Sequence, residues 1–235
     1  MPEVKISATD GGQFSAYIAL PQTQPAPAIV VIQEIFGVNK NVRDICDKYA
    51  AQGYVAIAPD LFWRLEPNVQ LTDKTEEEWA KAFDLMNRFN IDKGVEDIQA
   101  TTTAIRNQGS CNGVVGAIGF CLGGKLAYLT ATRTDIDASV GYYGVQIDQM
   151  LDEAVNITAP LMLHIAEEDK FVDKAAQTKI IESLKGNAHV TLHSYKGVDH
   201  AFTRIGGDHY DANAAQLAHE RTDMFLAKHL GLDEI

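Results

Sequence analysis

The chain has 235 residues, of which 46% are hydrophobic and 22% charged, and its formal net charge at pH 7 is −12. This length suffices for one sizeable hydrophobic core, and the lack of a low-complexity linker or internal repeat predicts a single domain over residues 1–235. The acidic balance argues against nucleic acid and anionic membranes as partners.

Cysteine usage and the N-terminus indicate the compartment. The three cysteines (Cys46, Cys111 and Cys121) are too few for a disulfide framework and lack the spacing of a zinc site. The chain shows no basic segment followed by an apolar leader, and no apolar run long enough to span a bilayer. We therefore expect a cytoplasmic monomer with reduced thiols and with neither a metal nor another cofactor.

Strands and helices alternate along almost the whole predicted chain. Apolar runs between turn residues predict strands over residues 4–7, 14–20, 27–32, 54–58, 114–118, 136–143, 161–165 and 190–195. Helical periodicity predicts helices over residues 41–52, 75–89, 93–108, 124–130, 174–184 and 211–229. This alternation of strands and helices predicts an α/β fold with a mostly parallel sheet covered by helices on both faces. Such sheets bind ligands beyond the carboxyl ends of their strands.

One of those carboxyl ends carries the motif Gly119-Phe120-Cys121-Leu122-Gly123. Glycines on both sides of a single reactive residue, between a buried strand and a helix, are typical of the nucleophile elbow of hydrolases. Cysteine stands where serine is usual, and a thiol at a helix N-terminus is favoured as the attacking thiolate. The motif alone fits a buried structural cysteine equally well.

An acid and a histidine follow in the order that an elbow requires. Asp169 comes after the strand 161–165, and His200 comes after the strand 190–195. Asp169 could instead cap the next helix, and Glu167 or Glu168 could serve as the acid. Because the order and the strand ends agree together, we predict a triad of Cys121, Asp169 and His200.

The chain resembles the dienelactone hydrolase family (carboxymethylenebutenolidases), which has the α/β-hydrolase fold. The resemblance covers nearly the whole chain and rests on Gln33–Gly37, Ala58–Phe62, Gly119–Gly124, Gly141–Gly144, Asp169–Val172 and His200–Arg204. It implies that Cys121 is the nucleophile, His200 the base and Asp169 its orienting acid. We expect no large cap, because the longest insertion, residues 64–89, is mostly one predicted helix.

The resemblance also assigns the remaining site residues. It implies that Glu34 helps to deprotonate the thiol when substrate binds, and that the backbone N–H groups of Ile35 and Leu122 form the oxyanion hole. It further implies that Arg64 and Arg204 bind a substrate carboxylate, a role that suits the planar guanidinium fork.

Five aromatic residues could form an apolar wall for a flat ring, although core packing is the commoner role for any one of them. They are Trp63, Phe36, Tyr143, Phe171 and Phe202. Two positions depart from the family pattern: Ala201 stands where serine is frequent after the histidine, and Phe120 where tyrosine is frequent before the nucleophile. Both departures remove hydroxyl groups near the site.

The expected activity is hydrolysis of a carboxylate-bearing enol lactone through an acyl-enzyme, in the degradation of aromatic compounds. One alternative is a thiol-dependent esterase or lactonase acting on a different small ester. Another is a binding or redox-sensing homologue without catalysis. We interpret Cys46 and Cys111 as structural, and His164, inside a predicted core strand, as a packed or hydrogen-bonded histidine.

Overall fold

The computed structural model describes residues 3–232. Met1 and Pro2, which belong to the N-terminal segment where no leader is expected, lie outside it. The chain divides into two compact units, Met1–Ala117 and Ile118–Ile235. The division falls inside the strand β5 (Cys111–Phe120) and not in a linker. The single domain expected over residues 1–235 stays a prediction.

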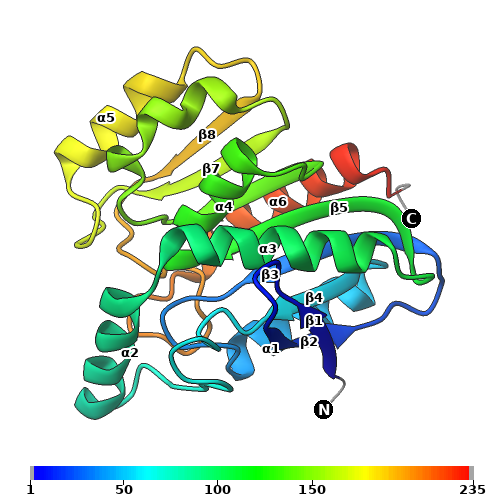
Figure 1. Cartoon of the computed structure of the whole chain (residues 1–235). Coiled ribbons are helices and arrows are strands. Elements are labelled where there is room, and N and C mark those ends of the chain that lie inside the picture. The colour runs from blue at the N-terminus through cyan, green and yellow to red at the C-terminus, as the bar shows by residue number, and fades with distance from the viewer. Residues whose placement is uncertain (1–2, 233–235) are drawn as a thin grey trace. The chain divides into compact units, whose positions relative to one another are not determined.

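The first unit contains a hairpin and two buried strands. The strands β1 (Glu3–Ser7) and β2 (Gln13–Ala19) pair antiparallel, close to the N-terminal end of the chain in Figure 1. The strand β2 then pairs antiparallel with β4 (Val55–Pro59), which pairs parallel with β3 (Ala26–Ile32). Every residue of β3 and β4 is buried. Their apolar sequences follow from this burial, since a parallel strand covered on both faces has no polar side.

Three helices complete the first unit, and each begins at a residue whose side chain caps it. They are α1 (Lys40–Ala51), α2 (Glu76–Arg88) and α3 (Ile91–Arg106), capped by Asn39, Thr75 and Asn90. The sequence 75–78 has the form of a reciprocal capping box, but only half of it forms. Thr75 accepts from the N–H of Glu78, whereas the Glu78 carboxylate accepts from the N–H of Thr72.

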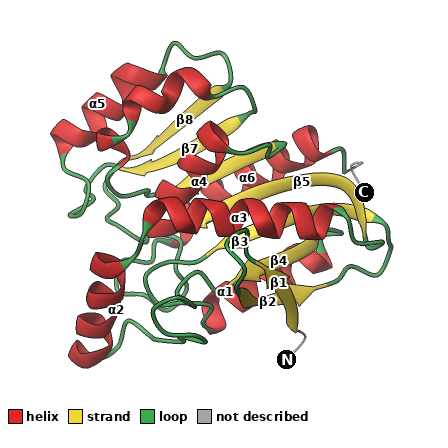
Figure 2. Cartoon of the chain, in the orientation of Figure 1, coloured by secondary structure: helices red, strands yellow, loops and turns green. Residues whose placement is uncertain are grey.

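The second unit is built on parallel strands (Figure 2). β6 (Ala138–Tyr142) pairs parallel with β7 (Leu161–Ala166), which pairs parallel with β8 (Val190–Tyr195), and the latter two lie side by side in Figure 1. The helices are α4 (Leu122–Arg133), α5 (Lys174–Leu184) and α6 (Ala212–Leu230). Two short 3-10 helices, η1 (Ile147–Gln149) and η2 (Leu151–Asn156), were not predicted.

This arrangement places chemistry-bearing residues after three of the strands. Cys121 follows β5, Asp169 follows β7 and His200 follows β8. Because parallel strands end at the same edge of a sheet, these loops are gathered there.

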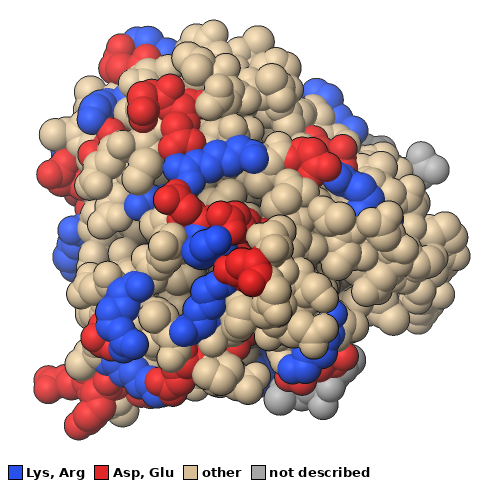
Figure 3. Space-filling view, in the orientation of Figure 1, with Lys and Arg blue, Asp and Glu red and all other residues tan. Residues whose placement is uncertain are grey.

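Charged side chains of both signs are interspersed on the face drawn in Figure 3. Recorded surface ion pairs include Lys81–Glu66 and Arg133–Glu153, each at 2.6 Å. The net charge of −12 is therefore not gathered into one acidic patch on that face.

Candidate active site

Cys121 occupies a sharp bend between β5 and α4. Its backbone has φ 58° and ψ −114°, a conformation that a residue with a side chain rarely adopts. The bend is held by backbone hydrogen bonds: the N–H of Cys121 donates to the carbonyl of Tyr142 at 3.0 Å, and its own carbonyl accepts from Gly124 at 3.0 Å and Lys125 at 3.2 Å. The thiol is thus fixed at the N-terminus of α4, where the helix dipole favours a negative charge.

Close backbone approach requires glycine at position 119 of the motif and at position 124, directly after it. A Cβ atom on Gly119 would overlap the carbonyl of Gly123, and one on Gly124 would lie 2.5 Å from the carbonyl oxygen of Tyr142 and 2.8 Å from the Cα of Gly144. These neighbours are backbone atoms, which cannot rotate away as a flexible side chain does. The elbow therefore depends on the absence of side chains at these positions.

We expect Gly124→Ala to destabilise the fold by about 1–3 kcal/mol, because overpacking against backbone outweighs the gain in helix propensity. Chemical denaturation of the native protein and the variant measures the difference. Gly186→Ala is the matched control, since a Cβ there meets nothing within 4 Å. Equal stability of the two variants would contradict the close-packing explanation.

The imidazole of His200 is held by Asp169. Nδ1 of His200 lies 2.8 Å from Oδ2 of Asp169, and the two side chains are only 5% and 2% exposed. The other oxygen of Asp169 accepts the backbone N–H groups of Phe171 at 2.8 Å and Val172 at 3.2 Å. A buried carboxylate fixed on both oxygens gives the imidazole one orientation.

Neither alternative for this acid agrees with the structure. The helix α5 is capped by Asp173, whose side chain accepts from the N–H of Ala176. Glu168 is exposed and pairs with Lys174 at 3.3 Å. Glu167 is partly exposed, and its backbone N–H donates to Tyr195. Of the three acidic residues, Asp169 is the one that contacts His200.

Cys121 lies close enough to His200 to affect the pKa of the imidazole. Burial lowers the pKa of His200, but the charge on the Cys121 sulfur and hydrogen bonds to Asp169 and Cys121 outweigh it and raise the pKa to about 10. The arrangement can therefore hold a nucleophilic sulfur beside a proton donor.

Two aromatic rings border the imidazole edge-on. The ring centroid of Phe171 lies 4.8 Å from that of His200, and the ring of Tyr143 lies 5.0 Å from it. Tyr143 is buried, and its hydroxyl is 2.9 Å from Oγ1 of Thr203, whereas Phe171 is 52% exposed. Phe171 thus presents an apolar surface next to the imidazole. Phe202 is fully buried against Tyr143 and belongs to the core.

The remaining predicted residues of this unit lie around the same loops. Leu122 is the first residue of α4, and the N–H groups of the first turn have no acceptor inside a helix. Arg204 is half-buried, and its backbone N–H donates to Ala201. Ala201 is buried with φ 61°, and Phe120 stacks on Tyr142 at 4.9 Å. Phe120 therefore keeps the packing role of an aromatic ring without a hydroxyl.

The other predicted site residues belong to the first unit. Glu34 and Ile35 are buried directly after β3. Phe36 is buried too, and its ring packs edge-on against Trp79 of α2 with the centroids 5.0 Å apart. Phe36 therefore has the core-packing role that is common for an aromatic residue.

Arg64 is engaged by carboxylates of its own unit. Its Nη1 pairs with Asp97, whose side chain is buried, and its Nη2 lies 2.9 Å from both oxygens of Asp10. Trp63 lies under the guanidinium at 4.2 Å and also donates its indole N–H to Asp97 at 2.8 Å. The sequence did not indicate this pairing. A substrate carboxylate would have to compete with two carboxylates that already hold the charge of Arg64.

His164 has the hydrogen-bonded core position expected for it. Its Nδ1 lies 2.7 Å from the hydroxyl of Tyr195, its Nε2 lies 2.9 Å from Oγ1 of Thr222, and Tyr142 stacks on the ring. Burial, followed by the charges of His193, His219 and Arg221, holds the pKa of His164 well below its ordinary value of 6.5. The ring is therefore neutral in the folded protein.

This neutral histidine predicts acid sensitivity of the fold. Unfolded His164 binds a proton below about pH 6.5 while the folded ring does not, so the free energy of unfolding should fall as the pH drops below 6.5. The slope is at most about 1.4 kcal/mol per pH unit for one proton. Denaturation at pH 5 and pH 7 should show a smaller difference for His164→Gln than for the native protein. His189→Gln, at an exposed position, should retain the native difference; equal slopes in both variants would assign the sensitivity elsewhere.

The two other cysteines lie in the core. Cys46 is fully buried in α1, and burial raises the pKa of its thiol far above the ordinary value. Cys111 begins β5 and is also buried. Neither cysteine is bonded to another, and their burial agrees with a structural role.

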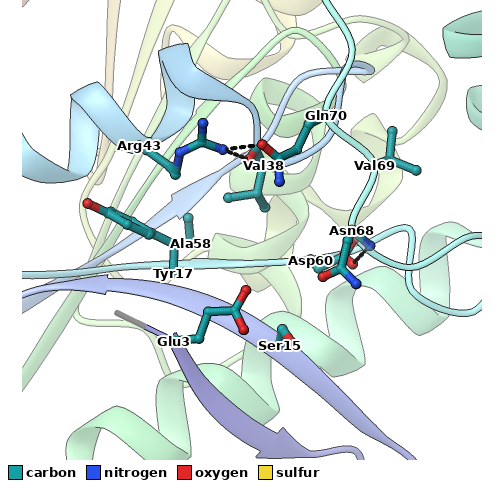
Figure 4. Close-up of a pocket in the computed structure, with 10 residues that line it drawn as sticks. All are labelled: Glu3, Ser15, Tyr17, Val38, Arg43, Ala58, Asp60, Asn68, Val69 and Gln70. Atoms are coloured by element: carbon teal, nitrogen blue, oxygen red, sulfur yellow. Dashed lines mark hydrogen bonds between the residues drawn. The ribbon is translucent and has the colours of Figure 1, made fainter. Parts of the chain in front are cut away.

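Small cavities lie in both units. One in the first unit has about 30 Å³ and is shown in Figure 4. There Arg43 is hydrogen-bonded to Gln70 and to the carbonyl of Val38, and Asp60 accepts from the N–H of Asn68 at 2.6 Å. The other, about 20 Å³, lies beside Asp169 in the second unit. Each has room for one or two water molecules and not for an organic ligand.

Residues 3–232 contain no group of three or more His, Cys, Asp or Glu side chains that could hold a metal ion. Within the same range, no helix is both long and apolar enough to cross a membrane.

Known proteins resemble the chain in both sequence and structure. The model of the dienelactone hydrolase family matches residues 14–230. A protein of Azospirillum brasilense named "Putative carboxymethylenebutenolidase" is 50% identical and covers 98% of this chain and 100% of its own length. The carboxymethylenebutenolidase of Pseudomonas putida is 38% identical, with 95% of each chain covered.

Among solved structures, "Putative Dienelactone Hydrolase" from Klebsiella pneumoniae subsp. pneumoniae matches with a TM-score of 0.86 at 25% identity, covering 96% of this chain and 97% of its own. The match confirms the fold class expected from the sequence, an α/β-hydrolase fold with a mostly parallel sheet and flanking helices.

Proposed function

The chain belongs to the dienelactone hydrolase family, and on that premise we propose that it opens a carboxylate-bearing enol lactone with the triad Cys121, His200 and Asp169. Family membership makes it a hydrolase of lactones or esters. The identity of the nucleophile, the acyl-enzyme and the charge of the substrate are our proposals. The degradation of aromatic compounds, the cytoplasmic location and the monomeric state are proposed with them.

One observation carries the proposal: Nδ1 of His200 lies 2.8 Å from Oδ2 of Asp169, and Cys121 lies close enough to His200 to raise the pKa of the imidazole. The carboxylate fixes the imidazole, and the imidazole supports the thiolate at the N-terminus of α4. The same three residue types in this order along the chain and at these strand ends suit acyl transfer.

In the proposed acylation, the Cys121 thiolate attacks the carbonyl carbon of the lactone and forms a C–S bond. The carbonyl electrons move to the oxygen, where the N–H of Leu122 and, by resemblance to the family, that of Ile35 stabilise the charge. Collapse breaks the ring C–O bond and releases an enolate that stays part of the acyl group. The proton for this enolate comes from the imidazolium of His200.

In the proposed deacylation, neutral His200 takes a proton from water as the water attacks the thioester carbon. The C–S bond breaks, the sulfur leaves as thiolate, and the carboxylic acid is released. The imidazolium and thiolate are thereby restored, so the cycle balances in protons. By resemblance to the family, Glu34 assists formation of the thiolate when it is needed, which limits oxidation of the sulfur.

Arg204 is the better candidate for the substrate carboxylate. It lies four residues after His200 and is half-buried in the same unit, whereas Arg64 is already paired with Asp97 and Asp10. A guanidinium matches a carboxylate in two parallel hydrogen bonds.

The experiment compares hydrolysis of one lactone with and without its carboxylate, by the native protein and by Arg204→Ala. We expect the variant to lose about 10- to 100-fold in kcat/KM for the carboxylated lactone, the equivalent of one charge-assisted hydrogen bond or a bidentate pair. The neutral lactone should lose less than about threefold. The hydrolysis of both lactones by Arg64→Ala is measured in the same way. Equal losses on both substrates would refute the proposed charge recognition.

A second candidate is a thiol esterase or lactonase for a neutral ester. The pairing of Arg64 with Asp97 and Asp10 favours it, because these carboxylates already hold the charge of one of the two arginines proposed for a substrate carboxylate. The native protein would in that case hydrolyse the neutral substrate with the higher kcat/KM. A homologue without catalysis would form no acyl-enzyme with activated esters by mass spectrometry.

A further inference from the structure

We propose that Asp199 is a positioning residue that holds His200 against Asp169; this rests on the triad proposed above. Asp199 precedes His200 directly, and its side chain is 14% exposed. One oxygen, Oδ1, accepts the backbone N–H of His200 at 2.7 Å and the backbone N–H of Lys170 at 3.1 Å. A single atom therefore joins the loop of the base to the loop of the acid, one residue away from Asp169.

The second oxygen carries an ion pair. Oδ2 of Asp199 lies 2.8 Å from Nζ of Lys170, which is 72% exposed, and 3.6 Å from Nδ1 of His209, which is 44% exposed. Ion pairs between side chains this exposed contribute little to the stability of the fold. Burial raises the pKa of Asp199, but the hydrogen bonds from Lys170 and His200 outweigh it and lower the pKa. The carboxylate thus stays an ionised acceptor for the two backbone N–H groups.

The loop of the base needs such a restraint. Ala201, next to His200, has φ 61°, in the left-handed region that residues with a side chain rarely adopt. The only other backbone hydrogen bond described between residues 167–170 and residues 197–200 runs from the N–H of Glu168 to the carbonyl of Val198, at 2.9 Å. Without Asp199, the backbone at His200 would be free to relax and the imidazole would move with it.

The position of the imidazole matters to the rate, because a displacement of about 1 Å in a catalytic geometry costs about 10²-fold. Asp199 contacts no reacting atom in this proposal. Its effect should therefore appear in kcat and in the chemistry of the thiol, and not in substrate affinity.

The test uses three variants of the full chain. Asp199→Ala removes both functions of the carboxylate, Asp199→Asn keeps an oxygen that accepts both N–H groups, and Lys170→Met removes only the ion pair. For hydrolysis of p-nitrophenyl acetate we expect Asp199→Ala to lower kcat about 10- to 100-fold with KM changed less than about threefold. The other two variants should stay within about threefold of the native kcat.

A second readout follows alkylation of Cys121 by iodoacetamide as a function of pH, with the labelled peptide measured by mass spectrometry. In Asp199→Ala the rise in alkylation should move to higher pH, because a displaced imidazole supports the thiolate less well. Lys170→Met should retain the native profile. Alkylation needs no substrate turnover, so absence of lactone hydrolysis in the native protein would refute the proposed function and not this role of Asp199.

Native kcat and a native alkylation profile in Asp199→Ala would overturn the proposal. A loss of kcat in Lys170→Met equal to that in Asp199→Ala would also overturn the proposal, because it would assign the loss to the ion pair. If Asp199→Ala does not fold, Asp199→Asn provides the test. Its carboxamide oxygen can still accept both N–H groups, so a loss of about tenfold or more in its kcat would contradict the hydrogen-bond role of Asp199.

Discussion

Cys121→Ala is expected to lower kcat for lactone and ester hydrolysis by about 10⁴- to 10⁶-fold, the scale of removing a nucleophile from a triad. The variant should still fold, since alanine meets the backbone strain at φ 58° no worse than cysteine does. Steady-state hydrolysis and a thermal melt measure the two quantities. Any residual activity should come from the oxyanion hole and from binding.

Variants of the other two cysteines are the matched controls. Cys46→Ala and Cys111→Ala remove buried thiols outside the elbow, so they should reduce stability while kcat of the folded fraction stays within about threefold. Activity in Cys121→Ala comparable to that of these controls would refute the assignment of the nucleophile.

The same variant tests the pairing of His200 with the sulfur. Two of the four interactions that raise the pKa of His200 above its ordinary value involve Cys121. The pKa of His200, followed by NMR, should therefore fall well below about 10 in Cys121→Ala. An unchanged titration would show that Asp169 alone sets the protonation of the imidazole.

The sequence predicted most of the fold because several strands are buried on both faces and most of the helices are amphipathic. Burial makes β3 a run of apolar residues that stands out without any knowledge of tertiary structure. The order of Cys121, Asp169 and His200 could be predicted for a related reason: each residue lies in the segment after a strand, directly after β5 for Cys121, three residues after β7 for Asp169 and five residues after β8 for His200. Local patterns that tertiary packing reinforces are the ones that sequence reasoning recovers.

Pairings between polar side chains distant in the sequence could not be predicted. Asp97 lies 33 residues from Arg64 and is one of several acidic residues in α3, so nothing local marks it as the partner of that arginine. Asp199 sits beside His200 in the sequence, but its hydrogen bond to Lys170 depends on how two loops meet. The 3-10 helices η1 and η2 are too short to show a periodicity.

Asp169→Asn should lower kcat by about 10³- to 10⁴-fold while leaving the fold intact. The amide can present its NH₂ to His200 and thereby select the wrong tautomer of the ring, and it removes the negative charge that stabilises the imidazolium. Two of the interactions that raise the pKa of His200 come from Asp169, so this pKa should also fall. Hydrolysis rates and the NMR titration of His200 check both expectations.

Glu167→Gln and Glu168→Gln are the matched controls, because these carboxylates lie one or two residues away and the sequence alone admitted either as the acid. Both variants should keep kcat within about threefold, since Glu168 is exposed and pairs with an exposed lysine. A large loss in either variant with a small one in Asp169→Asn would move the orienting role to that glutamate. We expect the large loss of kcat in Asp169→Asn and a small one in the glutamate variants, because Asp169 makes the buried 2.8 Å contact with His200. Neither glutamate can replace this contact without displacing the loop after β7.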